Sequence, residues 1–141
     1  MKKLYSSNKV FVSKSKIKNA GRGVFAAQNI EKDEVIEVCP LIIAPKNDMS
    51  NLAESILVTY FFYFGKNKER LAVALGFGSI YNHSYTPNAT YKIKVKEKTI
   101  NFIAIKDIKK NDEITVNYNF GNPKNKNPLW FAVAPPYKSK R

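Results

Sequence analysis

The sequence has 141 residues, of which 44% are hydrophobic, so it fits one domain with its own core and excludes wholesale disorder. Its single cysteine, Cys39, excludes an intrachain disulfide, and one histidine beside one cysteine is too few for a typical zinc site, so we expect no metal. The formal net charge of +13 is typical of proteins that attract polyanions, although a lysine-rich bias alone would also produce it.

Apolar segments are short throughout the chain. The longest, such as residues 57–64, are far below the ~20 residues that a membrane-spanning helix needs. The basic start of the sequence lacks the apolar stretch of a signal peptide. We therefore expect a soluble intracellular protein without membrane contact, with the cytoplasm and a host nucleus both open as compartments.

Short strands are predicted in the first third of the chain, after an N-terminal extension over residues 1–8. Residues 9–12 are rich in β-branched and aromatic side chains, and residues 24–27 follow a turn that contains Gly21 and Gly23. Residues 34–43 form a longer strand-like run that ends before Pro45. The acids Glu31, Asp33, Glu34 and Glu37, in and next to this run, would meet either solvent or a basic peptide.

One helix is predicted, over residues 51–64. Asn51 followed by Glu54 resembles a capping box, and Gly65 stands where a helix stop belongs. The helix would be the main non-β element of the chain.

The second half again predicts strands. Residues 91–96 and 99–105 alternate around Glu97 and Lys98 as a hairpin does, and residues 114–118 form a last strand. Residues 121–134 contain Trp130 and Phe131 in a segment rich in Asn, Pro and Lys, and residues 135–141 form a basic tail. The pattern favours a mainly β protein of small folded sheets with one or two short helices, rather than a βαβ enzyme.

Three clusters of residues could carry chemistry. They are Gly21-Arg22-Gly23-Val24-Phe25, then the stretch from Gly78 to Asn88 with Asn82 and His83, and finally Asp112 to Tyr118. Glycines allow a ligand to approach the backbone, and an Asn side chain offers both a donor and an acceptor. Taken singly, each cluster has a plain alternative: a hairpin turn, a structural histidine and a core tyrosine.

In this order the clusters resemble the SET domain, with its N-terminal glycine turn, its Asn-His-Ser followed by Pro-Asn, and its Glu-Ile-Thr strand that ends in tyrosine. The resemblance covers a SET domain over residues 9–120 and is closest to the short stand-alone members of viruses and bacteria. It implies a β-clip-like fold with a C-terminal pseudoknot. It also implies a protein-lysine methyltransferase that uses S-adenosylmethionine.

Site residues follow from that resemblance position by position. Arg22, Gly23 and Val24 would contact the cofactor through their backbone, and Asn82 and His83 would hold it. Tyr118 would lie beside the transferred methyl group, in both a catalytic and a cofactor-binding role. Trp130 would help to close the site in place of the zinc segment that follows many SET domains.

Departures from the family pattern suggest a hypothesis about the product. Many members have an aromatic residue where Val116 stands and an aspartate where Asn117 stands. We expect Tyr91 to narrow the lysine pocket as a second catalytic residue, which favours low methylation states.

The partners are less defined by the sequence. The resemblance implies a lysine-bearing protein substrate, for which a histone or histone-like tail is the first candidate, and a homodimer is compatible with the short length. The net charge leaves nonspecific nucleic-acid contact open. The alternative function is a non-enzymatic basic module that binds chromatin or nucleic acid on the same fold.

Overall fold

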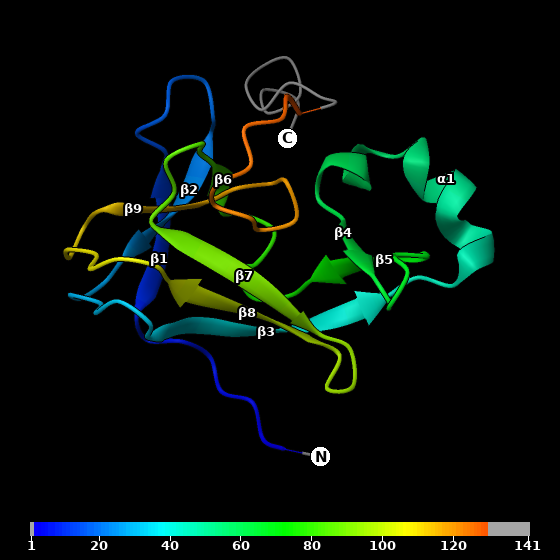
Figure 1. The fold of residues 1–141 in the computed structure, drawn as a ribbon, viewed down its shortest axis with the longest axis horizontal. Coiled ribbons are helices and arrows are strands. Elements are labelled where there is room, and N and C mark those ends of the chain that lie inside the picture. The colour runs from blue at the N-terminus through cyan, green and yellow to red at the C-terminus, as the bar shows by residue number, and fades with distance from the viewer. Residues whose placement is uncertain (1, 130–141) are drawn as a thin grey trace.

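Two β-sheets enclose a shared core in the computed structural model, which describes residues 2–129 (Figure 1). The four-stranded sheet has the order β1 (Val10–Lys14), β2 (Arg22–Ala26), β9 (Glu113–Val116), β6 (Asn82–His83). The five-stranded sheet has the order β4 (Phe62–Phe64), β5 (Arg70–Ala74), β3 (Val35–Ile43), β8 (Thr99–Ala104), β7 (Ala89–Lys94). The prediction of a mainly β protein is confirmed.

The four-stranded sheet brings the three sequence clusters together. The β1–β2 hairpin turns through Asn19 and Gly21, which both have positive φ angles, and the glycine has no side chain to oppose this. Strand β9 pairs antiparallel with β2 on one side and parallel with β6 on the other. Since β6 consists of Asn82 and His83, this pairing places both next to the glycine turn and to the strand that leads to Tyr118.

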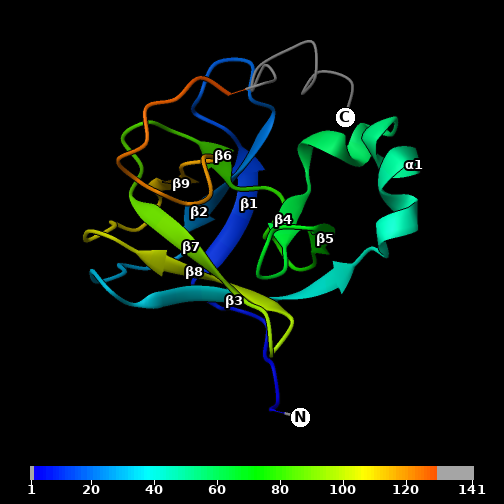
Figure 2. The same ribbon diagram turned by 45° about the vertical axis from the view of Figure 1, so that its right-hand side comes forward.

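The five-stranded sheet curls so that its two edges approach each other. Strands β4 and β7 lie at opposite ends of the strand order, yet the rings of Phe62 and Tyr91 are 5.1 Å apart. Phe102 of β8 lies between them on the same face, in contact with both rings. Helix α1 lies beyond β4 and β5, on the other side of them from β7 (Figure 2).

The predicted helix over residues 51–64 is wrong beyond Ala53. The structure has η1 (Lys46–Asp48), α1 (Met49–Ala53) and η2 (Ile56–Thr59), followed by β4. The N-cap of α1 is Asp48 rather than Asn51, and Ser55 starts the next turn by accepting a hydrogen bond from the Leu57 amide. The aromatic run after Tyr60 favours a strand, and pairing of Phe62 with Ala72 stabilises it there.

The core joins both sheets. Val24, Ile114 and Val116 of the first sheet are buried against Ile100 and Phe102 of the second. Cys39 is also in this core, where burial raises the pKa of its thiol. The predicted strands at residues 9–12, 24–27, 34–43, 91–96, 99–105 and 114–118 are confirmed to within a few residues.

Two further searches cover the described residues. Between residues 2 and 129 no helix is long and apolar enough to cross a membrane. The same part of the chain contains no group of three or more His, Cys, Asp or Glu side chains that could hold a metal ion.

Candidate functional site

Glu113, the first residue of β9, joins the glycine turn to β6. Its carboxylate accepts hydrogen bonds from the Ser15 hydroxyl at 2.7 Å, the Lys16 amide at 2.9 Å and the Asn82 side chain at 2.9 Å. The Asn82 amide also donates to the Arg22 carbonyl at 2.8 Å. One carboxylate and one amide therefore fix the relative positions of the β1–β2 loop, β2 and β6.

Gly23 leaves the space that this network needs. A Cβ atom at position 23 would lie 2.2 Å from a Glu113 carboxylate oxygen and 3.1 Å from the Asn82 amide nitrogen. The sequence predicted that Gly23 lets a ligand approach the backbone closely. In the structure, the groups that approach Gly23 closely are the side chains of Glu113 and Asn82. Any larger residue here would displace Glu113 and release Asn82.

Asn88 and Asn117 fix the two ends of β9. The Asn88 side chain donates to the Glu113 carbonyl and accepts from the Thr115 amide, both at 2.9 Å. Asn117 is fully buried, donates to the Asn125 carbonyl at 2.6 Å and accepts from the Asn119 amide. An aspartate at position 117 has no donor for Asn125, so this departure from the family pattern has a structural role here.

The C-terminal segment then passes the loop that follows β6. Tyr85 donates its hydroxyl to the Asn127 carbonyl at 3.0 Å, and Lys126 donates to the Tyr85 carbonyl. The C-terminal segment therefore lies against the loop that follows β6.

His83 is held in one tautomer. Its Nδ1 accepts a hydrogen bond from the Tyr118 amide at 3.0 Å, so the neutral ring carries its proton on Nε2. That Nε2 is buried and has no hydrogen-bond partner among the described residues. Burial lowers the pKa of the imidazole, which keeps the ring neutral. A buried donor without an acceptor is costly, so this position suits a ligand that accepts a hydrogen bond.

Tyr118 links this cluster to a second one. Its hydroxyl donates to the Tyr81 carbonyl at 2.6 Å, while the Tyr81 hydroxyl donates to the buried Glu37 carboxylate at 2.8 Å. Glu37 also accepts from the Phe77 amide. Burial raises the pKa of both tyrosine hydroxyls, so both stay protonated and neutral. Glu37 therefore lies in the interior, not in the solvated turn that the sequence indicated.

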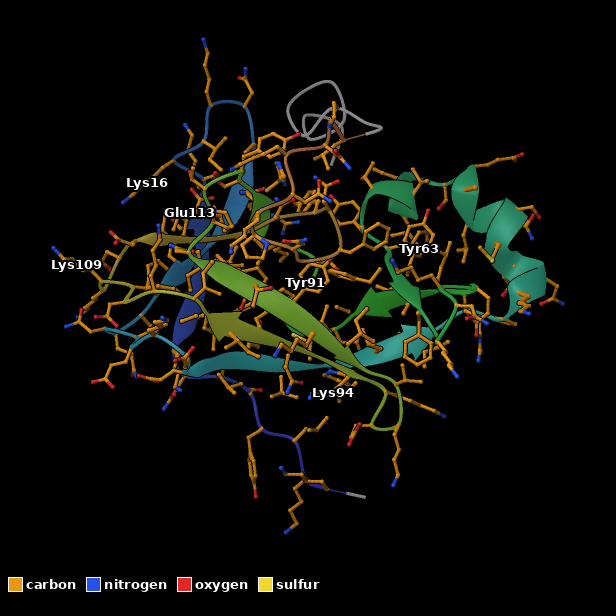
Figure 3. All side chains as sticks on the ribbon, viewed as in Figure 1. Lys16, Tyr63, Tyr91, Lys94, Lys109 and Glu113 are labelled. Atoms are coloured by element: carbon orange, nitrogen blue, oxygen red, sulfur yellow. The ribbon has the colours of Figure 1, made fainter. Side chains whose placement is uncertain are left out.

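A cavity of about 1050 Å³ lies between the two edges of the curled sheet. Tyr81, Tyr118 and Val116 line one part of it, Tyr91 comes from β7, and Tyr63 comes from β4 (Figure 3). Tyr91 is half-buried, and burial raises the pKa of its hydroxyl. Aromatic rings therefore form a large part of the cavity wall.

Most of the predicted site residues come together. Arg22 and Asn82 belong to the hydrogen-bonded cluster around Glu113, and Gly23 packs against Asn82 and Glu113. His83 follows Asn82 in β6 and accepts from the amide of Tyr118, which lines the same cavity as Tyr91. Val24 is different, because its fully buried side chain lies in the core and its backbone sits between β1 and β9. Trp130 lies outside the described residues.

Sequence reasoning missed the roles of two acids. Glu113 was seen only as part of a strand motif, and Glu37 only as one of several acids near a turn. The pattern around Glu37 did contain a signal, because its neighbours Ile36, Val38 and Cys39 are apolar and a strand through them buries part of its length. The partners of both acids lie far away in sequence, as with Tyr81 and Glu37.

Comparisons with known proteins give a consistent result. A family model described as the SET domain matches residues 21–119. A histone-lysine N-methyltransferase of Schizosaccharomyces pombe, specific for H3 lysine-37, is 30% identical over 112 residues, which are 79% of this chain and 70% of that relative.

Solved structures agree with this. A Plasmodium falciparum protein described as a histone methyltransferase has a TM-score of 0.62 and 30% identity, over 82% of this chain and 96% of that one. A humanized mutant of the Chaetomium thermophilum Polycomb Repressive Complex 2, bound to the inhibitor GSK126, has a TM-score of 0.70 and 26% identity, over 84% of this chain and only 16% of that one.

Proposed function

The chain belongs to the SET-domain family, and we propose that it methylates a histone lysine. Its activity is that of a protein-lysine methyltransferase that uses S-adenosylmethionine. The observation that carries the proposal is the convergence of the glycine turn, the Asn82–His83 pair and Tyr118 at one end of a large aromatic cavity. The histone substrate is supported by the Schizosaccharomyces pombe relative, which is named for H3.

Cofactor binding is proposed for the cluster around Glu113. The unpartnered, buried Nε2–H of His83 fits a ligand with acceptor atoms, which an adenine ring and a carboxylate both provide. Asn82 and the backbone of Arg22 and Gly23 would complete this site, with Val24 contributing only its main chain. When bound, S-adenosylmethionine supplies a methyl group already activated by the positive sulfonium.

The target amine must lose its proton before it can attack. A free lysine has a pKa of about 10.4, so making it neutral near pH 7 requires roughly 4–5 kcal/mol. Transfer into the aromatic cavity lowers that pKa by desolvation. Tyr118 and Tyr91 would orient the amine with neutral hydroxyls, and their raised pKa values argue against a role as general base.

A low methylation state is proposed for the product. Val116 and Tyr91 both line the cavity with Tyr118, and the Tyr91 ring is fixed against Phe62 and Phe102. A ring fixed on two sides limits the room that successive methyl groups would need.

Closure of the site by the C-terminal segment, including Trp130, is also a proposal. Its support is that Pro128 and Leu129 line the cavity. If the substrate is a histone, the protein would act on chromatin in a nucleus. The net charge of +13 would then favour contact with the DNA of that chromatin.

Calorimetric titration of S-adenosylmethionine into wild type and Asn82→Ala tests the function. We expect micromolar binding by the wild type and a loss of at least tenfold in the variant, because two hydrogen bonds that position the site disappear. Mass spectrometry of histones incubated with protein and cofactor then identifies the methylated lysine. A folded wild type that binds no cofactor but binds DNA in a salt-sensitive way would support the non-enzymatic alternative instead.

A further inference from the structure

The charged residues around the cavity are all of one sign. Among the described residues, three lysines, Lys68, Lys92 and Lys94, line it, and no Asp or Glu does. The sequence contains eleven Asp and Glu residues, so a shortage of acids does not explain why none of the described ones lines this wall. A segment that binds here with its lysine in the cavity therefore meets positive charge around it.

Lys68 lies at the cavity mouth opposite the C-terminal segment. It belongs to the loop between β4 and β5, and its ammonium is 3.6 Å from the centre of the Phe120 ring. Phe120 is 54% exposed, and the centre of its ring is 5.8 Å from the centre of the Tyr63 ring of β4. The ammonium is thus held over an exposed ring, where it can still reach a bound segment.

Lys92 and Lys94 lie along the opposite side, on β7. Five consecutive residues of this region, 91–95, line the cavity. Since successive side chains of a strand point to opposite faces, a cavity that touches all five runs along the edge of the strand. Strand β7 is the last in its sheet, so this edge has no neighbouring strand in the described part of the chain. An extended segment lying there is close to both lysines.

These lysines form no ion pair in the described part of the chain. Among residues 2–129 the one ion pair within 4.0 Å joins Lys9, which precedes β1, to Glu34, which precedes β3. Glu69, the acid next to Lys68 in sequence, accepts from the Asn67 amide and lies against Gly65, and it forms no ion pair with Lys68 within 4.0 Å. The positive charge at the groove is therefore available to a partner.

We propose that this groove selects lysines whose sequence neighbours are acidic or uncharged, and disfavours lysines flanked by Lys or Arg, with Lys68 and Lys94 as specificity-determining residues. The proposal rests on the proposed function, because it assumes that the target lysine enters this cavity. Histones are basic overall, so such a filter would restrict which of their lysines react. Charges this exposed interact over about one Debye length, roughly 8 Å at physiological salt.

Each charged residue next to the target lysine should change peptide affinity moderately, and several together should change it more. Pairs of exposed charges contribute about 0.2–1 kcal/mol, which is up to about fivefold in affinity for each flanking residue. Two acidic neighbours in place of two arginines should then change binding by about tenfold or more, and the difference should shrink as salt is raised.

Binding of three synthetic peptides to the full chain tests the proposal. Each carries one lysine and a fluorescent label, and they differ only in flanking residues, which are Glu, Gln or Arg. Anisotropy in the presence of S-adenosylhomocysteine measures affinity, and mass spectrometry with S-adenosylmethionine measures methyl transfer. The variant Lys68→Glu/Lys94→Glu is compared with Lys109→Glu/Lys110→Glu, which changes net charge equally at the β8–β9 loop, away from Tyr91 and Lys94 (Figure 3).

The expected order of affinity is Glu, then Gln, then Arg, reversed in Lys68→Glu/Lys94→Glu and kept in the control variant. Equal affinities, a preference for the Arg peptide, or the same reversal in the control would overturn the proposal. Failure of the proposed function is separate, since it would show as absent cofactor binding and absent methyl transfer whatever the order of peptide affinities.

Discussion

The two halves of the site are built in different ways. Around Glu113, directional hydrogen bonds fix Ser15, Lys16 and Asn82 within a few ångströms of one another. Around the cavity, aromatic rings such as Phe62, Tyr91 and Phe102 contact each other without such bonds. A hydrogen-bonded cluster accepts one geometry, whereas packed rings accommodate side chains of similar shape.

This difference suggests that the two halves bind different molecules. The hydrogen-bonded cluster suits a ligand that is the same in every turnover, and the cavity suits a substrate whose neighbouring residues vary. Tyr118 belongs to both, because its amide bonds to His83 and its hydroxyl bonds to the Tyr81 carbonyl. Substitutions that affect one half and spare the other would establish the division.

Tyr118→Phe should have the largest effect on activity. The substitution keeps the ring and the amide bonded to His83 but removes the hydroxyl that donates to Tyr81. We expect the single-turnover rate of methyl transfer to fall about 10²-fold through misalignment of the amine, with cofactor affinity changed less than about threefold. Tyr85→Phe, which loses a hydroxyl at an exposed hydrogen bond, is the matched control. If the rate and the cofactor affinity fell by the same factor, Tyr118 would act only through the hydrogen-bonded cluster that holds the cofactor.

Glu113→Gln should affect the other half. The amide nitrogen of glutamine cannot accept a hydrogen bond, so one of the donors on Ser15, Lys16 and Asn82 loses its partner. We expect a loss of about 1–3 kcal/mol in the free energy of unfolding and about a tenfold weaker binding of S-adenosylmethionine, measured by denaturation and calorimetry. Glu97→Gln, in the exposed turn of the β7–β8 hairpin, should change neither.

Acidic pH should weaken the cluster around His83. Burial lowers the pKa of this imidazole in the folded protein, so the unfolded chain, with an ordinary pKa of about 6.5, binds a proton first as pH falls. Stability is therefore complete above about pH 6.5 and decreases as pH falls from there toward the lowered pKa of the folded state. Urea denaturation between pH 7.5 and 5 measures this. His83 is the only histidine in the chain, so His83→Gln should remove the dependence, and an unchanged slope would assign it to another group.

Tyr91→Phe should give the smallest change in stability, under about 0.5 kcal/mol, because the ring contacts to Phe62 and Phe102 remain. Its effect should be on the product, since loss of the hydroxyl enlarges the pocket beside Tyr118. Mass spectrometry of a methylated peptide should show more of the higher methylation states. An unchanged distribution would mean that Tyr91 does not set the product.

Local patterns in the sequence were sufficient for most strands, and they led to the prediction of the site residues. Alternation of apolar side chains located the β7–β8 hairpin, and the order of three clusters located Asn82, His83 and Tyr118. The helix over residues 51–64 failed because its capping signal was local, while pairing of β4 with β5 and the aromatic residues of that run favoured a strand.

Sequence alone thus determined the fold class and the family, because these depend on residue types and their order along the chain, and it predicted the residues of the site. Tertiary structure decided what holds those residues in place. The bond from Asn82 to Glu113 and the bond from Tyr81 to Glu37 each join residues more than thirty positions apart, and no periodicity encodes such contacts. It also decided the charge of the cavity wall, because only the curl of the sheet brings Lys68 and Lys94 to the same opening.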